Sequence, residues 1–261
     1  MAMSERSSRL VTFGLLLVGL FVSAFAVSQR FFREESSAAD IDHGSMGASM
    51  NDLGLTDTVD GTRLVIDTSS ATELTFHLER DGAPVTEFMA AHGALLHLAA
   101  IRSDLSGFQH LHPELAADGT WTTPIDLAQP GQWRVIVDTE PEATMAQVVL
   151  GADVVVPGNS ADQPLPPPAD SVQVDGLTVT RDGLTFAVVP ADDLQPYLGQ
   201  AAHLIAIRDG DLAYAHLHPD DDTLGRVTFG GSLPGAGTYR LFVQVMNGNQ
   251  VVTAAFTVVQ P

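Results

Sequence analysis

The stretch GALLHLAAIRSDLSGFQHLHP at residues 93–113 occurs again, as GQAAHLIAIRDGDLAYAHLHP, at residues 199–219. The match continues without a gap, so that residues 93–139 align with 199–245, and 16 of these 47 aligned residues are identical. The repeats of a solenoid are much shorter than the segments that this spacing implies. The sequence therefore predicts two copies of one domain in a chain of 261 residues.

Both copies consist of short runs in which apolar and polar residues alternate, separated by glycine, proline, aspartate and serine. Such runs are typical of half-buried β-strands, and turn signals every 8–12 residues or so indicate a β-sandwich. No stretch after the N-terminal hydrophobic segment has the period of an amphipathic helix. We expect two all-β domains, with strands over residues 63–67, 74–78, 95–101, 133–138 and 146–156, and over 177–180, 184–188, 203–207, 239–245 and 251–259.

A leucine, a glycine and an aromatic residue recur near the end of each aligned segment. A tyrosine at this spacing is typical of the corner of Ig-like sandwiches, in which its hydroxyl bonds to the backbone a few residues upstream. The sequence predicts this corner in both copies, with tryptophan in place of tyrosine in the first: Leu127-x3-Gly131-x-Trp133 and Leu233-x3-Gly237-x-Tyr239.

Composition divides the chain into five parts. A stretch with three consecutive prolines separates the two copies and predicts a semi-rigid, extended linker. A small, polar and acidic stretch before the first copy predicts a flexible tether. The expected parts are a hydrophobic N-terminal segment (1–33), the tether (34–57), the first sandwich (58–157), the linker (158–171) and the second sandwich (172–261).

The N-terminal segment contains an apolar run, Leu10–Val27, with Arg6 and Arg9 before it. One interpretation is a single membrane-anchoring helix, since about 18 apolar residues just span a bilayer. The other is a secretory signal peptide that is cleaved after Ala26, at a small-x-small site. The length favours the anchor, because the apolar region of a signal peptide usually ends at about 15 residues. Both place the two domains outside the cytoplasm, in the cell envelope or secreted.

The balance of charged residues restricts the partners. The chain has 12 basic residues, all of them arginine, 32 acidic residues and a formal net charge of −20. This charge argues against nucleic acid and anionic membrane surfaces as partners and favours cations. The chain also has no cysteine, which excludes disulfides, thiolate zinc sites, iron–sulfur clusters and cysteine-ligated blue-copper centres.

Histidines dominate the repeated frame, with the same spacing of 13 and then 2 in both copies. Residues i and i+2 of a strand share a face, so each His-x-His pair presents two imidazoles side by side. Antiparallel counting through a turn at residues 103–106 places His97 opposite His112, and the same count places His203 opposite His218. Each copy then offers three imidazoles to one metal ion. The candidate ligands are His97, His110, His112, His203, His216 and His218.

Three imidazoles without a thiolate suit zinc, copper(II) or nickel. Imidazole binds a metal only when neutral, so affinity should fall below about pH 6. The alternative interpretation is structural: the histidines bond to backbone carbonyls or carboxylates in tight loops, and duplication explains their identical spacing.

Weaker candidates for metal ligands lie near the motif and in the tether. Glu114 and Asp220 follow the motif in the two copies and offer an oxygen ligand, with solvated loop carboxylates as the alternative. His43, Met46 and Met50 in the tether offer a copper-binding segment, since thioethers select Cu(I).

Other conspicuous side chains have structural interpretations. Four have no aligned counterpart and are interpreted as packing residues: His77, His92, Met145 and Met246. Four arginines match between the copies and are expected to pair with carboxylates: Arg102 with Arg208, and Arg134 with Arg240.

The motif resembles that of exported bacterial domains of the YtkA-like type, which are grouped with heavy-metal-associated envelope proteins. The resemblance covers about 50 residues per copy and implies small Ig-like or cupredoxin-like sandwiches with a role in envelope metal handling. This chain departs from the family pattern in two respects. It has no lipobox cysteine, which excludes a lipid anchor, and it lacks the cysteine of an electron-transfer cupredoxin. The residues that carry it are His97-Leu98, Phe108-x-His110-x-His112-Pro113-Glu114 and Gly131-x-Trp133-Arg134, with Tyr214-x-His216-x-His218-Pro219 in the second copy.

The leading expectation is an exported, membrane-tethered metal-binding protein, with copper favoured over zinc and one histidine site per copy. One alternative is a non-catalytic tandem Ig-like module that docks on another envelope protein and whose histidines are structural. The other is a metalloenzyme such as a metallohydrolase, since three histidines and an open position also describe catalytic zinc. No catalytic motif accompanies the histidines, so we expect no enzymatic activity.

Overall fold

A computed structural model describes residues 53–220 and 223–261, which belong to one compact unit, Ser45–Pro261. These residues form strands, turns and irregular segments without a helix, which confirms the all-β prediction. The described residues therefore include no candidate for a membrane-spanning helix. The predicted N-terminal helix, most of the predicted tether, and the candidate ligands His43, Met46 and Met50 lie outside the described residues.

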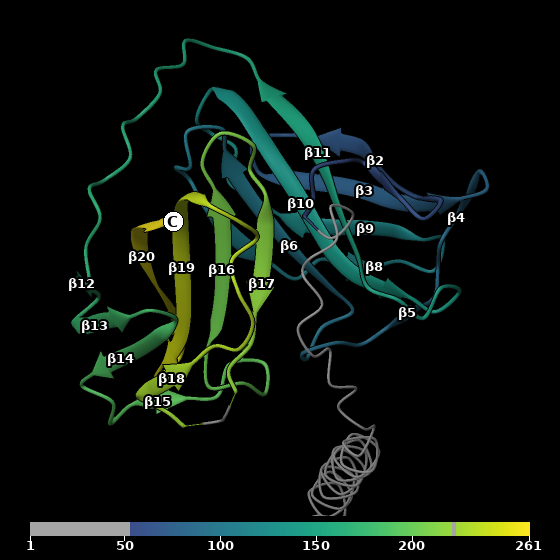
Figure 1. The fold of residues 1–261 in the computed structure, drawn as a ribbon. Helices are drawn as coiled ribbons and strands as arrows, with labels where there is room; N and C mark the ends of the chain where they lie inside the picture. The colour runs from purple at the N-terminus through teal and green to yellow at the C-terminus, as the bar shows by residue number, and fades with distance from the viewer. Residues whose placement is uncertain (1–52, 221–222) are drawn as a thin grey trace, which may run out of the picture. The chain divides into compact units, whose positions relative to one another are not determined.

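The first repeat forms two antiparallel sheets (Figure 1). One has the strand order β1-β2-β3-β9-β8, with β4 paired to β3, and the other has the order β11-β10-β6-β7, with β5 paired to β10. The strands are β1 (Thr58–Val59), β2 (Thr62–Ser69), β3 (Glu73–Arg80), β4 (Ala83–Pro84), β5 (Phe88–Met89), β6 (Leu96–Arg102), β7 (Gln109–Leu111), β8 (Glu114–Leu115), β9 (Thr120–Pro124), β10 (Gly131–Pro141) and β11 (Val148–Val156).

The second repeat has the same arrangement. Its sheets have the orders β12-β13-β14-β18 and β15-β19-β16-β17, with β20 paired to β19. The strands are β12 (Ser171–Val174), β13 (Leu177–Asp182), β14 (Thr185–Val189), β15 (Leu194–Gln195), β16 (His203–Arg208), β17 (Tyr214–Leu217), β18 (Arg226–Thr228), β19 (Gly237–Asn247) and β20 (Gln250–Gln260). Each of the ten strands predicted from alternation overlaps one of these, whereas the strands that alternation missed are five residues or shorter.

Each repeat encloses its own apolar core between its two sheets. In the first repeat the core includes Phe76, Trp121 and Trp133, and in the second it includes Phe186 and Phe256. Alternate residues of each strand point into this core, as the period of two requires. The two cores account for one face of every long strand.

A third apolar cluster lies between the repeats and covers the opposite face of one sheet from each. All seven residues of β6 are buried because Leu98 and Ala100 face the core of their own sandwich while Ala99 and Ile101 face the second repeat. Strand β16 is arranged in the same way, with Ile205 and its alternate neighbours turned toward the first repeat. The sheet β11-β10-β6-β7 therefore packs through its outer face on the sheet that contains β16 and β17 (Figure 1).

The predicted aromatic corner is present in both repeats. Trp133 Nε1 donates to the carbonyl oxygen of Gln129 at 3.0 Å. Tyr239 donates its hydroxyl to the carbonyl oxygens of Pro234 and Gly235, both at 2.9 Å. Tryptophan thus serves the same purpose as tyrosine, since each ring places a donor against the backbone four or five residues upstream.

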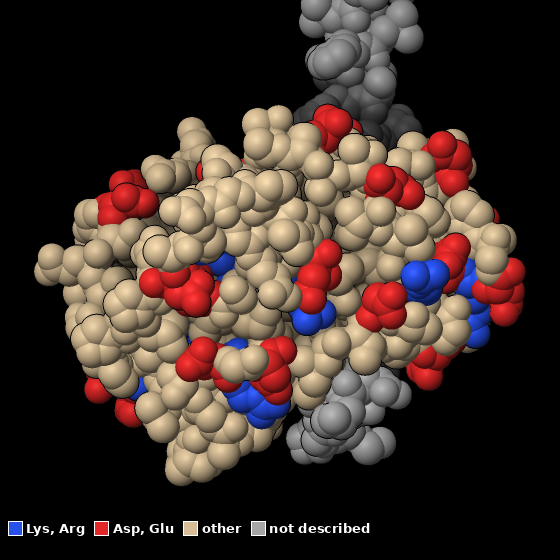
Figure 2. Space-filling view, turned by 90° about the horizontal axis from the view of Figure 1, so that it is seen from above, with Lys and Arg blue, Asp and Glu red and all other residues tan. Residues whose placement is uncertain are grey.

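Three of the four matched arginines pair with carboxylates, as expected. Arg102 lies 2.9 Å from Asp104, and Arg208 lies 2.6 Å from Asp211. On the face shown in Figure 2, arginines lie beside acidic side chains rather than in a separate basic patch.

The two arginines of the second matched pair have different kinds of partner. Arg134 forms an ion pair with Asp153 at 2.9 Å. Arg240 instead donates to the hydroxyl of Thr257 at 2.8 Å and lies over the ring of Phe242, so the expectation of a carboxylate partner is wrong there.

The proline-rich linker contains no strand between β11 and β12 (Figure 1). Its first half binds the first repeat, where Arg102 donates to Ser160 Oγ and the backbone nitrogen of Gln163 donates to Asp104, both at 2.9 Å. Leu165 packs on the apolar cluster between the repeats. The linker therefore forms part of the joint structure of the two repeats.

Candidate metal centre

The hairpin of the first repeat has the register predicted from its sequence. Strand β6 pairs with β7 so that Leu98 lies opposite Leu111 and Ala99 lies opposite His110. One further step in this register places His97 opposite His112. Since residues two apart share a face, all three histidines of the repeat lie on the same side of the sheet.

The second repeat has the equivalent register. Strand β16 pairs with β17 through Leu204 opposite Leu217 and Ile205 opposite His216. One further step places His203 opposite His218. The predicted hairpin register is thus confirmed in both repeats.

The histidine-bearing face of each sheet is the face that packs on the other repeat. The ring centroid of His97 lies 4.8 Å from that of His216 and 6.1 Å from that of His203. The ring centroid of His110 lies 5.3 Å from that of His216. The sequence predicts one histidine group per repeat, and the structure brings the two groups together. We call this set the histidine cluster: His97, His110, His112, His203, His216 and His218.

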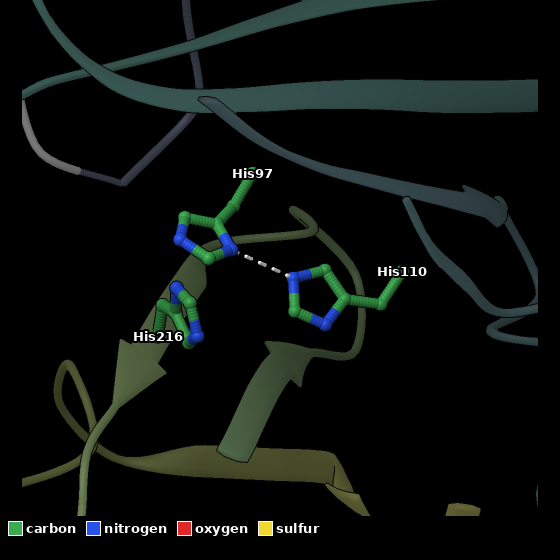
Figure 3. Close-up of side chains that lie close together, drawn as sticks. All are labelled: His97, His110 and His216. Carbon is green, nitrogen blue, oxygen red and sulfur yellow. Dashed lines mark hydrogen bonds between the residues drawn. The ribbon is translucent and has the colours of Figure 1, made fainter. Parts of the chain in front are cut away.

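Two groups of three histidines within this cluster could hold a metal ion. In one group His97, His110 and His216 each offer a ring nitrogen, and these atoms lie within 4.8 Å of one another. In the other group the residues are His203, His216 and His218. Figure 3 shows the first group, with rings from both repeats turned toward one another. His216 belongs to both groups, so it is the central residue of the cluster.

Hydrogen bonds determine where the lone pairs of His97 and His110 point. His97 Nε2 lies 3.2 Å from the carbonyl oxygen of Ala91, which only accepts, so Nε2 carries the proton and Nδ1 is a lone pair. Gln244 donates its amide nitrogen to Thr253 Oγ1 at 3.0 Å and turns Oε1 toward His110 Nδ1 at 2.6 Å. His110 Nδ1 is therefore the donor, and its Nε2 is a lone pair.

These two nitrogens lie 3.2 Å apart, along the dashed line of Figure 3, and this contact is a hydrogen bond only if one of them carries a proton. With the tautomers given above, both nitrogens carry lone pairs. Two lone pairs repel unless a cation lies between them. Two ligands of one tetrahedral ion, each about 2.0–2.1 Å from it, lie roughly 3.3 Å apart. His112 Nε2 also lies 3.2 Å from His97 Nδ1, although His112 belongs to neither triad. The distance between His97 Nδ1 and His110 Nε2 is close to that between two ligands of one ion.

Several ring nitrogens of the second repeat are buried without a hydrogen-bond partner among the described residues. They are Nδ1 and Nε2 of His203, Nδ1 and Nε2 of His216, and Nε2 of His218. Leaving a buried polar group unsatisfied costs about 1–3 kcal/mol, so such groups are rare and require an explanation. A bound metal ion would satisfy the nitrogens that carry lone pairs.

Burial keeps the cluster in the neutral form that binds metals. Desolvation, followed by repulsion from neighbouring histidines, lowers the pKa of His203 and that of His218 to about 3. Desolvation likewise lowers the pKa of His97 to about 4 and the pKa values of His110 and His216 well below 6.5. At neutral pH these imidazoles therefore carry no charge.

Two residues that the sequence analysis did not single out, Asp138 and Gln244, contact the cluster at equivalent positions of the two repeats. Asp138 is buried on β10 opposite His97, and its Oδ2 lies 3.5 Å from His216 Nδ1. Gln244 is its counterpart on β19 and contacts His110. Each reaches the first histidine of the other repeat's His-x-His pair, which no sequence motif reveals.

His92 also belongs to the surroundings of the cluster. Its ring stacks on that of His218, with centroids 3.4 Å apart and planes 12° apart. The packing interpretation holds in this sense, although the partner is a candidate ligand from the other repeat. The equivalent residue of the second repeat is Leu198, with the same left-handed backbone (φ 52° against 51°), so the turn itself does not require histidine.

The weaker candidates lie apart from the two triads. Glu114 and Asp220 are exposed, and neither belongs to a histidine triad. His77 pairs with Asp67 at 2.8 Å, away from the cluster. Met145 is 76% exposed, so its interpretation as a packing residue is wrong.

Comparison with known proteins agrees with the internal duplication. The family model described as a domain of unknown function (DUF8832) matches residues 51–155 and again 170–260, once in each repeat. No curated protein matches the chain. Because the two matches together cover most of its length, the chain belongs to the DUF8832 family.

Proposed function

We propose that this protein binds a transition-metal ion in the histidine cluster, with ligands from both repeats. The observation that carries the proposal is the pair of lone pairs on His97 and His110, which face each other at 3.2 Å with their tautomers determined by Ala91 and Gln244. A hydrogen bond to the second nitrogen of a ligand histidine is the usual way in which proteins orient a metal-binding imidazole. The buried nitrogens of His203 and His216 support the same conclusion.

The donor set indicates which ions to test first. Neutral imidazoles suit zinc and copper, whereas magnesium and calcium prefer oxygen ligands. We favour copper, because the tether contains His43, Met46 and Met50, whose thioethers suit Cu(I). Zinc is the second candidate.

The proposed cellular location is based on the N-terminal apolar run. An anchor or a signal peptide at Leu10–Val27 would put the repeats outside the cytoplasm. We propose a role in metal handling in the cell envelope, with the membrane contacted only through this N-terminal segment. The resemblance to YtkA-like domains supports the same role.

The alternative function is a tandem interaction module in which the histidines only fill the interface between the repeats. The stack of His92 on His218 and the bond from His97 to Ala91 favour it, because both are protein contacts that need no ion. It leaves both ring nitrogens of His203 and Nε2 of His216 without an explanation.

The test is a titration of the full chain, purified in detergent, with Zn(II) and Cu(II) by calorimetry. The variant carries alanine at His110, His112, His216 and His218, and the control variant is His77→Ala, which removes a histidine outside the cluster. We expect tight binding by the parent and the control and its loss in the variant. No binding by the parent would refute the metal function and leave the interaction module.

A further inference from the structure

Asp138 is a buried acidic residue, with 5% exposure of the whole residue. The side chain of Asp104 is also buried, but it pairs with Arg102 and lies away from the histidine cluster. Its Oδ2 lies 3.5 Å from His216 Nδ1, and the two side chains are 7% and 1% exposed. A carboxylate from the first repeat thus faces the central histidine of the second.

Neighbouring side chains hold this carboxylate in place. Gln147 donates its amide nitrogen to Asp138 Oδ1 at 2.6 Å. The phenol of Tyr214 is fully buried nearby, and burial and the Asp138 carboxylate raise its pKa well above 10. Oδ2 therefore remains turned toward His216, whose Nδ1 proton it attracts. That leaves Nε2 of His216 as the nitrogen available to a metal ion.

The equivalent position of the second repeat shows that the fold does not require a carboxylate here. Gln244 occupies it, is also buried, and bonds to His110 through a neutral amide oxygen. The histidines and Gln244 carry no charge at neutral pH. A cation bound in the cluster would favour the ionised form of Asp138, which then adds one negative charge to one side of the cluster.

We propose that Asp138 is a positioning and specificity residue, which orients His216 toward the ion and makes the cluster select divalent over monovalent metals. This inference rests on the proposed metal function. The Coulomb energy between a carboxylate and an ion is proportional to the charge of the ion, so Asp138 stabilises a divalent ion twice as strongly as a monovalent one. A carboxylate that contacts the second ring nitrogen of a metal-bound histidine typically contributes 10–100-fold in metal affinity.

The first experiment compares the full-length parent in detergent with the isosteric variant Asp138→Asn. Affinities for Zn(II) and Cu(II) are measured by competition with a chelator, and affinity for Cu(I) is measured likewise under anaerobic reducing conditions. We expect the variant to bind the divalent ions about 10–100-fold more weakly and Cu(I) only about 3–10-fold more weakly. Equal losses for both charges would mean a purely structural role and overturn the proposal.

The second experiment uses the internal repeat as a control. Gln244→Glu places a carboxylate behind His110, in the position that mirrors Asp138. Added to Asp138→Asn, it should restore the affinity for Zn(II) to within about threefold of the parent. In the parent background it should tighten Zn(II) binding, which tests the proposal even if Asp138→Asn does not fold. Absence of both effects would refute the role of charge.

The two proposals fail in different ways. A parent that binds none of the three ions contradicts the metal function itself. A parent that binds them, with an Asp138→Asn variant of unchanged affinity, contradicts only the role of Asp138.

Discussion

Asp138 and Gln244 occupy equivalent positions in the two repeats, and each contacts the first histidine of the other repeat's His-x-His pair. Asp138 lies 3.5 Å from His216, and Gln244 lies 2.6 Å from His110. The two contacts are therefore reciprocal, as in a dimer in which residue i contacts j and j contacts i. The duplicated chain forms within itself the kind of interface that two identical subunits form. The duplication also allows one side to differ, because the two positions mutate independently.

His216 should be the most important single ligand. It belongs to both triads, whereas His218 belongs to one. We expect His216→Ala to weaken Zn(II) binding by more than about 100-fold. This loss exceeds that expected when a residue that only contacts a metal ligand is removed. His218→Ala should cost less, and His77→Ala should cost nothing. Chelator competition on the four proteins gives the order, and equal affinities of the first two variants would contradict it.

The metal-free protein should lose stability in mild acid. Burial lowers the pKa of His97 to about 4, against 6.5 for an exposed histidine. Between these pH values the unfolded chain binds more protons than the folded protein, so the free energy of unfolding falls as the pH drops below 6.5. For His97 alone, the loss between pH 7.5 and pH 5 is about 2 kcal/mol.

Urea unfolding of the metal-free protein at pH 7.5, 6 and 5 measures this loss. His203 and His218, whose pKa values are about 3, should add to it in the same direction. A free energy of unfolding that is constant over this range would show that the histidines are not buried in the neutral form.

The tyrosine corner should stabilise the second repeat. Tyr239 donates to two carbonyl oxygens, those of Pro234 and Gly235, and its ring is fully buried. Tyr239→Phe keeps the ring and removes the donor, so we expect a loss of about 1–2 kcal/mol in the free energy of unfolding. Denaturant unfolding of the parent and the variant measures this loss, and a neutral Tyr239→Phe would contradict the contribution of the corner.

The apolar contact between the repeats should support the metal centre. Phe242 is 4% exposed and stacks on Phe108 across the interface, with ring centroids 3.8 Å apart. Phe242→Ala should cost about 3–5 kcal/mol of stability, as for other buried phenylalanines. It should also lower the affinity for Zn(II), because the ligands come from both sides of this interface. Val259→Ala removes an exposed side chain of β20 and should change neither quantity. Unchanged affinity in a destabilised Phe242→Ala would mean that ligand placement does not depend on this contact.

Local patterns in the sequence predict the long strands and the histidine-bearing hairpin of each repeat. Alternation with a period of two identified the long strands, since residues on one face of a sheet share one environment. Counting through the turn gave the hairpin register that places His97 opposite His112, and duplication supported the same register for His203 and His218. The strands that alternation missed have two to four residues, except β9 with five, and so short a run shows too few alternations to be distinguished.

The duplication, the all-β architecture and the shared face of the histidines in each repeat can be derived from local sequence patterns. What covers that face depends on how the two repeats pack. Alternation assigns side chains to the two sides of a sheet but carries no information on the partner of the outer side, which depends on packing between residues more than 100 positions apart. The joint histidine cluster, the stack of His92 on His218 and the contact of Asp138 with His216 all depend on that packing.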